Sequence, residues 1–313
     1  MSVLGIKYMD YYVAEEELTV ENLVNQVEVE AIPAAFSSKG EYKQFANTIL
    51  ELESVRVENV FTKFEVLERL LDKMFNTDVV KRSDIDLIIL VEERTASSGN
   101  NIAQQLQYKF NLTNAFIFNA SGNHCANLEV VISTISQIQN SDINNVLILN
   151  STKVDSVKDR IIGSYGILGD AAGVILLSRD ESRLKIINSC VENNGQLYQA
   201  DPEKDNNLLH SKYLMKCVKK VMDKSDYTLE DVSKLIIQNA NPLLYSYILA
   251  NAGLNTDKIY NSNFGKYGHL DCLDFLVNLH DATKEQRHKR GDLILSVGMG
   301  WAGAYVSILF SVN

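Results

Sequence analysis

Short apolar runs alternate with segments of helical periodicity along the whole chain. Some runs, such as DIDLIILV at residues 84–91, are almost continuously apolar over the length of a strand, which is typical of strands buried on both faces of a sheet. The run at residues 114–118 is also predicted to be a buried strand. In total we predict strands at residues 3–9, 84–91, 114–118, 145–150, 184–190, 231–238, 257–261, 292–297 and 303–312. Residues 166–178 are predicted to form a glycine turn that leads into a further strand.

Other segments place apolar residues three or four positions apart, as in a helix that packs one face on a sheet. This spacing predicts helices at residues 18–29, 62–75, 101–110, 126–138, 205–221, 242–251 and 269–281. Thr19 is a candidate N-cap of the first helix, and residues 39–52 are predicted to be a connector of mixed polarity.

The second half of the chain repeats the order of parts found in the first half. Such a repeat indicates a duplicated α/β unit, with an N-terminal half at residues 1–180 and a C-terminal half at residues 181–313. Cys125 and His269 coincide under the duplication, because each opens the third helix of its half. A pseudo-twofold arrangement would bring both helix starts to one central pocket.

Composition narrows the classes of function. The 313 residues suit two domains or one large two-part fold, and a net charge of -10 argues against a nucleic-acid surface. We find no apolar run long enough to cross a bilayer and no signal-peptide pattern at the N-terminus, so we expect a cytoplasmic protein that does not enter a membrane. The four cysteines lack C-x-x-C pairing or zinc-ligand spacing, which predicts free thiols and no metal site.

Cys125 lies in the sequence FNASGNHCANLEVVI, between a predicted strand and a predicted helix. The free N-H groups and the dipole at a helix N-terminus favour a thiolate, which is the nucleophilic form of cysteine. Gly122 permits a sharp turn just before it. The alternative is that Cys125 is a small buried apolar residue, as most free cysteines are.

The sequence resembles the thiolase-like fold and, within it, the ketosynthase III (3-oxoacyl-acyl-carrier-protein synthase III)-like family. The resemblance spans nearly the whole chain and rests on DIDLIILV, SGNHCANLE, GILGDAAGVILLS, QNANPL, FGKYGHLDCLD and GDLILSVGMGWAGAYVSILF, in that order. It implies a duplicated, five-layered α-β-α-β-α fold with two pseudo-symmetric halves.

The same resemblance implies that Cys125 takes an acyl group from coenzyme A or from the phosphopantetheine arm of an acyl carrier protein, which act as substrates with no bound cofactor. It also implies an oxyanion hole made by the backbone N-H groups of Cys125 and Gly300. Two fixed donors suit a tetrahedral oxyanion, although Gly298 and Gly300 could instead form only a tight turn.

Two departures from the family pattern change the expected chemistry. Condensing enzymes of the group carry His-Gln-Ala-Asn where this chain has QNAN at residues 238–241, and an asparagine where it has His269. An amide at Gln238 does not exchange a proton near neutral pH, which disfavours decarboxylative condensation. Gln238 and Asn241 are candidate substrate-binding residues.

The chain resembles a Cys-His-Asp subgroup of acyltransferases that pass an acyl group to a hydroxyl or amine of a small molecule, typically in specialised-metabolite biosynthesis. This resemblance assigns Cys125, His269 and Asp274 as catalytic residues. Helix geometry alone leaves Asp271 as a competing partner of His269. A condensing enzyme, a thioester hydrolase and a non-catalytic family member are the alternatives.

The resemblance also implies a homodimer, for which the strand at residues 114–118 is the candidate for pairing across a twofold axis. Residues 94–100 are predicted to line the acyl pocket or the dimer contact. Lys153, Arg160 and Lys266 are candidate cations for a phosphopantetheine site or solvated surface charges.

Overall fold

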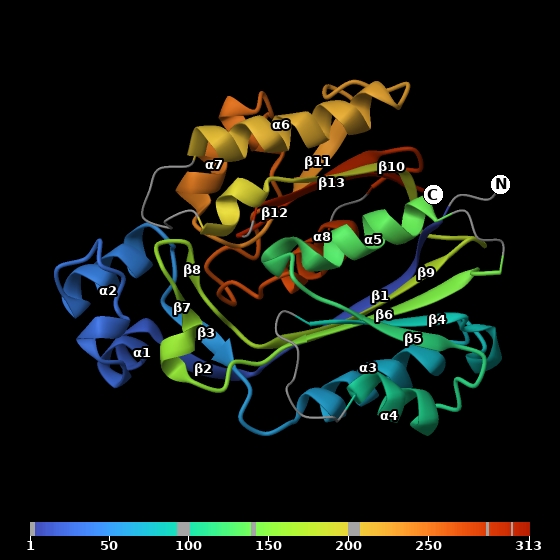
Figure 1. The fold of residues 1–313 in the computed structure, drawn as a ribbon, viewed down its shortest axis with the longest axis horizontal. Coiled ribbons are helices and arrows are strands. Elements are labelled where there is room, and N and C mark those ends of the chain that lie inside the picture. Colours follow the sequence, from blue (N-terminus) through green and yellow to red (C-terminus); the bar gives the residue numbers. More distant parts are fainter. Residues whose placement is uncertain (1–3, 93–100, 139–141, 200–206, 286–287, 302) are drawn as a thin grey trace.

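The computed structural model describes residues 4–92, 101–138, 142–199, 207–285, 288–301 and 303–313 (Figure 1). The strands are β1 (Gly5–Val13), β2 (Glu16–Thr19), β3 (Ser54–Val57), β4 (Leu87–Val91), β5 (Phe116–Ala120), β6 (Asn145–Thr152), β7 (Ile161–Ile162), β8 (Gly166–Ile167), β9 (Ala171–Ser178), β10 (Leu184–Asn193), β11 (Val232–Ile236), β12 (Leu293–Gly300) and β13 (Ala304–Val312). The α-helices are α1 (Val20–Gln26), α2 (Lys39–Thr48), α3 (Lys63–Phe75), α4 (Ile102–Lys109), α5 (Asn127–Gln137), α6 (Asn207–Asp223), α7 (Pro242–Asn251) and α8 (Leu273–Glu285).

Nine strands form one sheet in the order β11-β12-β13-β10-β1-β9-β6-β4-β5. The order β4-β6-β9-β1 in the first half is matched by β11-β12-β13-β10 in the second, with the same parallel and antiparallel pairings, and β5 is an additional strand at the edge of the first half. The two halves join where β1 pairs with β10 through only two residue positions. The predicted duplication is therefore confirmed.

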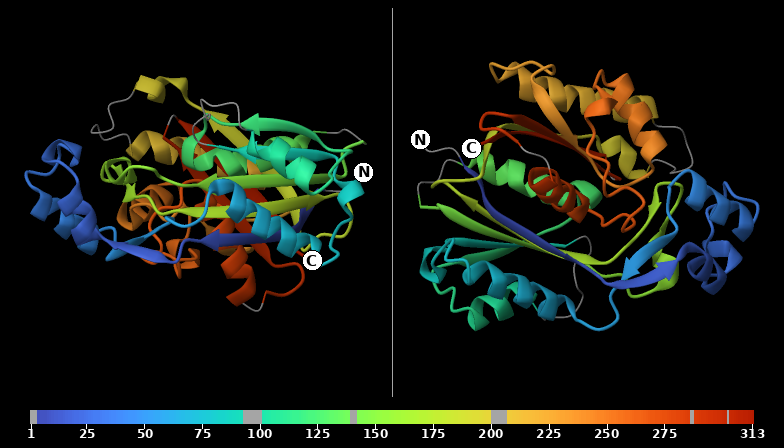
Figure 2. Two further views of the ribbon diagram at one scale, coloured as in Figure 1. Left: turned by 90° about the horizontal axis from the view of Figure 1, so that it is seen from below. Right: turned by 180° about the vertical axis from the view of Figure 1, so that it is seen from behind.

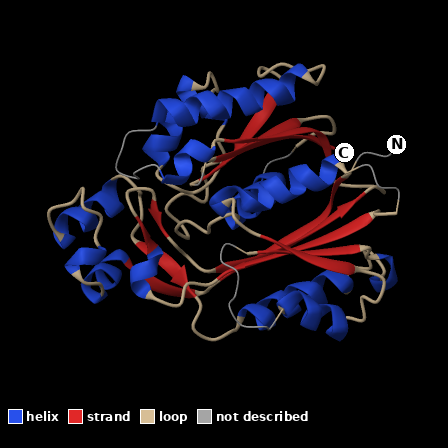
Figure 3. Cartoon of the chain, viewed as in Figure 1, coloured by secondary structure: helices blue, strands red, loops and turns tan. Residues whose placement is uncertain are grey.

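The two halves of the sheet face each other across a central layer formed by α5 and α8 (Figure 1). Helices α3 and α4 cover the outer face of the first half, while α6 and α7 cover that of the second. Figure 3 shows the resulting alternation of helices and strands. This is the predicted α-β-α-β-α arrangement, and it buries the starts of both central helices inside the molecule.

A smaller lobe made of α1, α2 and the antiparallel pair of strands β2 and β3 extends from one end of the layers (Figure 2). Thr19 caps α1, as predicted, since its side chain accepts a hydrogen bond from the backbone N-H of Asn22. The expectation of a connector at residues 39–52 was wrong, because α2 occupies residues 39–48 with Ser38 as its N-cap. This helix buries only a narrow face that includes Tyr42 and Ala46, so its apolar period is weak.

Two strand predictions also need correction. The run at residues 114–118 is not buried: β5 is the edge strand of the sheet, and the side chains of Phe116 and Phe118 are 53% and 40% exposed. Burial at an edge depends on strand order, which an apolar run does not reveal. The strand predicted at residues 257–261 is instead a 3-10 helix at Thr256–Lys258 followed by a single bridge from Ile259 to Leu235.

Candidate active site

Cys125 lies at the start of the central helix α5, as predicted. The chain leaves β5, turns at Gly122 with φ +97°, and enters a 3-10 turn at His124–Ala126 that leads into α5. His124 itself has φ +47°, a left-handed conformation that is uncommon outside glycine. This tight entry presents the half-buried Cys125 thiol ahead of the helix N-terminus.

His269 lies just before α8 instead of within it. Its backbone N-H donates to the carbonyl of Ile167 at 2.9 Å, and its carbonyl accepts from the N-H of Gly169 at 2.9 Å. These bonds hold the segment at His269 beside the strand-like stretch after β8. Gly166 packs against the histidine, because a β-carbon there would lie 3.3 Å from the β-carbon of His269.

Asp274 lies in the first turn of α8, fully buried. Its Oδ2 contacts His269 Nδ1 and accepts a hydrogen bond from the backbone N-H of Asn239 at 2.7 Å, while its Oδ1 accepts from the N-H of Leu270 at 2.9 Å. A carboxylate at Nδ1 favours the tautomer with a proton on that atom and leaves Nε2 for the other partner. His269 Nε2 lies 3.1 Å from Cys125 Sγ.

Asp274, His269 and Cys125 therefore form one hydrogen-bonded line between the starts of the two central helices. The contact at Nδ1 places Asp274 in the orienting position for which Asp271 was the alternative. His269 and Asp274, five residues apart, can make this contact because His269 precedes the regular helix.

The side chain of Gln238 forms hydrogen bonds with backbone groups of the site. Its Nε2 donates to the carbonyls of Cys125 at 2.6 Å and Met299 at 3.0 Å, and its Oε1 accepts from the Met299 N-H at 3.2 Å and from the Tyr245 hydroxyl. Asn241 caps α7 through the N-H of Leu244. Substrate binding by Gln238 or Asn241 stays a prediction, and it would require these bonds to exchange.

The end of β12 approaches the loop before Cys125 very closely. A β-carbon at Gly300 would lie 2.0 Å from the carbonyl oxygen of Asn123, so a side chain there would collide with backbone. Gly300 is thus next to the nucleophile, as an oxyanion-hole residue must be. The oxyanion hole formed by Cys125 and Gly300 stays a prediction.

Glu129, in the first turn of α5, is a buried carboxyl that was not among the predicted site residues. It accepts a hydrogen bond from the Ser296 hydroxyl and packs under Gly298, where a β-carbon would lie 2.0 Å from its Oε2. Burial raises the pKa of Glu129 to about 8, and nearby Asp274 adds to the increase. Glu129 is thus largely protonated near neutral pH.

Asp271, the alternative partner of His269, is a second buried acidic residue at the site. It is 2% exposed and has φ +56°, in the left-handed region. One of its carboxylate oxygens, a ring nitrogen of His269 and the Cys125 sulfur all lie within 4.8 Å of one another. Among the described residues, this is a group whose spacing could accommodate a cation, although cysteine spacing alone predicted no metal site.

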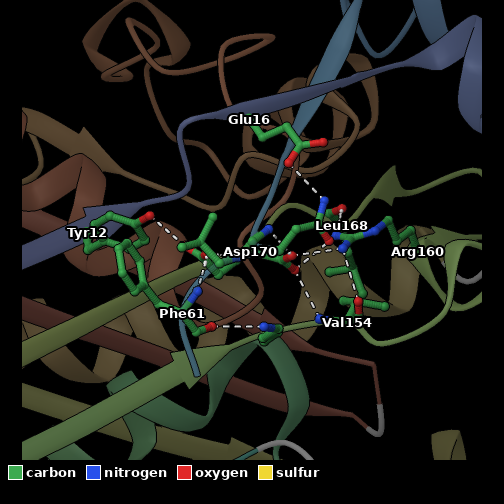
Figure 4. A network of polar contacts seen from close by, with 11 residues as sticks. Tyr12, Glu16, Phe61, Val154, Arg160, Leu168 and Asp170 are labelled. Carbon is green, nitrogen blue, oxygen red and sulfur yellow. Dashed lines mark hydrogen bonds and ion pairs between the residues drawn. The ribbon is translucent and has the colours of Figure 1, made fainter. Parts of the chain in front are cut away.

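A buried ion pair supports the segment that positions His269 (Figure 4). Arg160 donates to both oxygens of Asp170, at 2.9 and 2.8 Å, and to the carbonyl of Leu168 at 3.1 Å. Asp170 also accepts the backbone N-H groups of Glu58 and Val154. Because Leu168 bridges to His269, this network fixes the strand-like stretch on which the histidine rests.

The three candidate phosphopantetheine cations have different surroundings. Arg160 is 4% exposed and committed to Asp170, so its proposed role as an available cation was wrong. Lys153 donates to the carbonyl of Phe61 at 2.8 Å, and Lys266 is exposed over the ring of Tyr267. Residues 94–100, predicted to line the acyl pocket or the dimer contact, lie outside the described residues.

All four cysteines are free thiols, as predicted. Across the described ranges, no helix is both long and apolar enough to cross a membrane.

Known proteins share parts of this sequence. Residues 222–312 match the family described as 3-oxoacyl-acyl-carrier-protein (ACP) synthase III C terminal. The beta-ketoacyl-acyl-carrier-protein synthase III of Aquifex aeolicus is 24% identical over 249 residues, which cover 72% of this chain and 76% of that relative.

Solved structures share the fold over nearly the whole length. The 3-oxoacyl-acyl-carrier-protein synthase III from Aquifex aeolicus VF5 superimposes with a TM-score of 0.76 at 21% identity, covering 98% of this chain and 99% of that one. A structure described as the acyltransferase ChlB3 gives a TM-score of 0.81 at 16% identity, covering 99% and 98%. At such identities, the likeness establishes the fold alone.

Proposed function

We propose that this chain, which has the thiolase-like fold and resembles ketosynthase III-like proteins, is an acyltransferase. It takes an acyl group from coenzyme A or an acyl carrier protein onto Cys125 and passes it to a hydroxyl or amine of a small molecule. The observation that carries this proposal is the hydrogen-bonded line from Cys125 through His269 to the buried Asp274.

In the first half-reaction, His269 Nε2 accepts the proton of the Cys125 thiol. The thiolate attacks the carbonyl carbon of the donor thioester, the bond from that carbon to the pantetheine sulfur breaks, and the leaving thiolate takes the proton from His269. Backbone N-H groups of Cys125 and Gly300 bind the tetrahedral oxyanion. Asp274 stabilises the imidazolium that forms in each proton transfer.

In the second half-reaction, His269 Nε2 removes a proton from the acceptor hydroxyl or amine. The acceptor atom attacks the acyl carbon, the C–S bond to Cys125 breaks, and the thiolate regains the proton. Base catalysis of this kind accelerates a step about 100- to 10,000-fold. The same base could activate water, which makes hydrolysis the competing outcome.

Condensation is the second candidate, because the relatives' names describe synthases. The surroundings of Gln238 favour transfer instead. A condensing enzyme of the group would use a histidine there to hold an enolate, whereas Gln238 uses both ends of its amide to hold the backbone of Cys125 and Met299.

The relatives' names include an acyl carrier protein, which supports such a protein as donor or partner. We propose a homodimer that pairs through the edge strand β5, where Phe116 and Phe118 are exposed. A single-chain mass by light scattering at micromolar concentration would contradict the dimer. A cytoplasmic location also stays a proposal.

Intact-protein mass spectrometry tests the proposed function. The protein is incubated with short and medium acyl-CoA thioesters and acyl carrier proteins, beside Cys125→Ala and the matched control Cys190→Ala. We expect acyl adducts on the wild type and on Cys190→Ala, and none on Cys125→Ala. Carbon dioxide release from a malonyl thioester would favour condensation, and no adduct with any donor would favour a non-catalytic family member.

A further inference from the structure

Asp271 lies beside the two groups that an acceptor must reach, the Cys125 sulfur and the His269 ring. For transfer, the acceptor atom has to contact the acyl carbon on Cys125 and also His269, which removes its proton. The carboxylate of Asp271 lies within 4.8 Å of both the sulfur and a ring nitrogen, so it borders the same small volume. Of the two buried aspartates near His269, Asp274 contacts Nδ1 and orients the ring, which leaves a different role for Asp271.

The backbone of Asp271 supports a functional role. A left-handed φ of +56° is unfavourable for most residues and is tolerated best by Gly, Asn and Asp. Residues held in such conformations cluster at binding and catalytic sites. Because Asp271 is only 2% exposed, water screens its charge little, and the charge acts strongly on a group bound beside it.

Tyr165 and Trp301 form an aromatic pair, and each is next in sequence to a glycine of the site. Tyr165 precedes Gly166, which packs on His269, and Trp301 follows Gly300, which touches the loop before Cys125. The two rings meet edge to face, with centroids 4.2 Å apart at 81°, and both side chains are half-buried. Carboxylates and the faces of aromatic rings are the groups that proteins use to bind ammonium ions.

We propose that Asp271, with Tyr165 and Trp301, forms a subsite for the ammonium group of the acceptor. This inference rests on the proposed acyl transfer and names its acceptor class as an amine or amino alcohol. An amino alcohol that reacts through oxygen keeps its ammonium group beside Asp271 and gives its hydroxyl proton to His269 Nε2. The oxygen bonds to the acyl carbon, the C–S bond breaks, and the Cys125 thiolate takes that proton. An amine that reacts through nitrogen binds as the ammonium and loses two protons: one passes to water before attack, and the other passes through His269 Nε2 to the Cys125 thiolate as the C–S bond breaks. The same carboxylate repels anionic acceptors, including the carboxylate of a malonyl group.

Three small acceptors of similar size test the charge preference: ethanolamine, ethylene glycol and glycolate. Decay of preformed acyl-Cys125 is followed by intact mass with each of them, in the wild type, in Asp271→Asn and in Asp226→Asn. Asparagine tolerates the left-handed backbone, so Asp271→Asn changes the charge and keeps the shape. Asp226 is an exposed aspartate and controls for net charge.

We expect Asp271→Asn to lower the ratio of the ethanolamine rate to the ethylene glycol rate by about tenfold or more, through a higher half-saturating ethanolamine concentration. Intrinsic nucleophilicity cancels in this ratio. Asp226→Asn should keep the wild-type ratio. An unchanged ratio in Asp271→Asn, or no acceleration by ethanolamine, would overturn the inference while leaving acylation intact.

Binding is measured separately, without acylation, through the single tryptophan of the chain, Trp301. Ethanolamine should change its fluorescence saturably in the wild type and about tenfold more weakly in Asp271→Asn. Equal titration curves for the two proteins would overturn the subsite. Failure of Cys125 to acylate, by contrast, would overturn the proposed function.

Discussion

Two buried carboxylates, Asp170 and Asp274, have similar hydrogen-bond partners but different roles, one in the fold and one in the proposed catalysis. They are 1% and 0% exposed. Each accepts hydrogen bonds from two backbone N-H groups and from one basic side chain, which is Arg160 for Asp170 and His269 for Asp274. The difference lies in the basic partner.

The guanidinium of Arg160 is always charged, and it directs two nitrogens onto Asp170, so the pair is closed and structural. An imidazole, unlike a guanidinium, can gain and lose a proton near neutral pH. That of His269 uses one nitrogen on Asp274, which leaves the other for Cys125. In similar surroundings, a buried aspartate therefore forms a structural ion pair with arginine but orients the ring of a histidine. The Arg160–Asp170 ion pair also supports the stretch beside which His269 lies.

The largest effect is expected for Asp274→Asn. This change removes the charge that stabilises the imidazolium of His269, so the rate of acyl transfer should fall about 100- to 10,000-fold. Single-turnover kinetics on Cys125, with folding monitored by circular dichroism, measure the loss. A folded variant with the wild-type rate would mean that Asp274 only supports the fold.

Asp170→Ala should act on stability. The change leaves the guanidinium of Arg160 buried without its partner, which should lower the free energy of unfolding by about 3 to 5 kcal/mol. Urea denaturation measures it. The exposed pair Lys219–Asp223 is the matched control, because Lys219→Ala should cost less than about 1 kcal/mol. Equal costs for the two variants would contradict a structural ion pair at Asp170.

A third buried carboxyl, that of Glu129, accepts a hydrogen bond from a hydroxyl and has no basic partner among the contacts described above. Its contribution to the stability of the folded protein should therefore change with pH in the opposite direction to that of an ion-paired carboxylate. The pKa of Glu129 is about 8 in the folded protein against an ordinary 4.5, so between these values the unfolded chain has released a proton that the folded chain keeps. Stability is therefore lost as pH rises from the lower value to the higher one.

Glu129→Gln removes this penalty while preserving shape. The melting temperature of the variant should exceed that of the wild type by several degrees at about pH 9, and the difference should shrink toward about pH 5. A difference that is constant with pH would show that the Glu129 carboxyl does not titrate as its burial implies.

The sequence allowed prediction of the elements whose signal is local. Continuous apolar runs located β4, β6 and β12, and the duplication together with the family resemblance placed Cys125 and His269 at facing helix starts. The exposure of β5 could not be predicted, because it follows from the order of strands in the sheet.

The family resemblance favoured Asp274 over Asp271, but helix geometry read from the sequence could not make that choice. It depends on His269 standing ahead of α8, a position set by hydrogen bonds to Ile167 and Gly169, about a hundred residues earlier in the chain. The closure of Arg160 on Asp170 likewise depends on tertiary packing, so Arg160 looked like a free surface cation.

The measurement that tests the central claim most directly is the time course of acyl adduct formation on Cys125 by intact mass, in the wild type and in His269→Ala with one acyl-CoA or acyl-carrier-protein donor. Since His269 Nε2 lies 3.1 Å from the sulfur, the account predicts that acylation slows about 100-fold or more in the variant. Equal rates in the two proteins would contradict a catalytic pairing of Cys125 with His269.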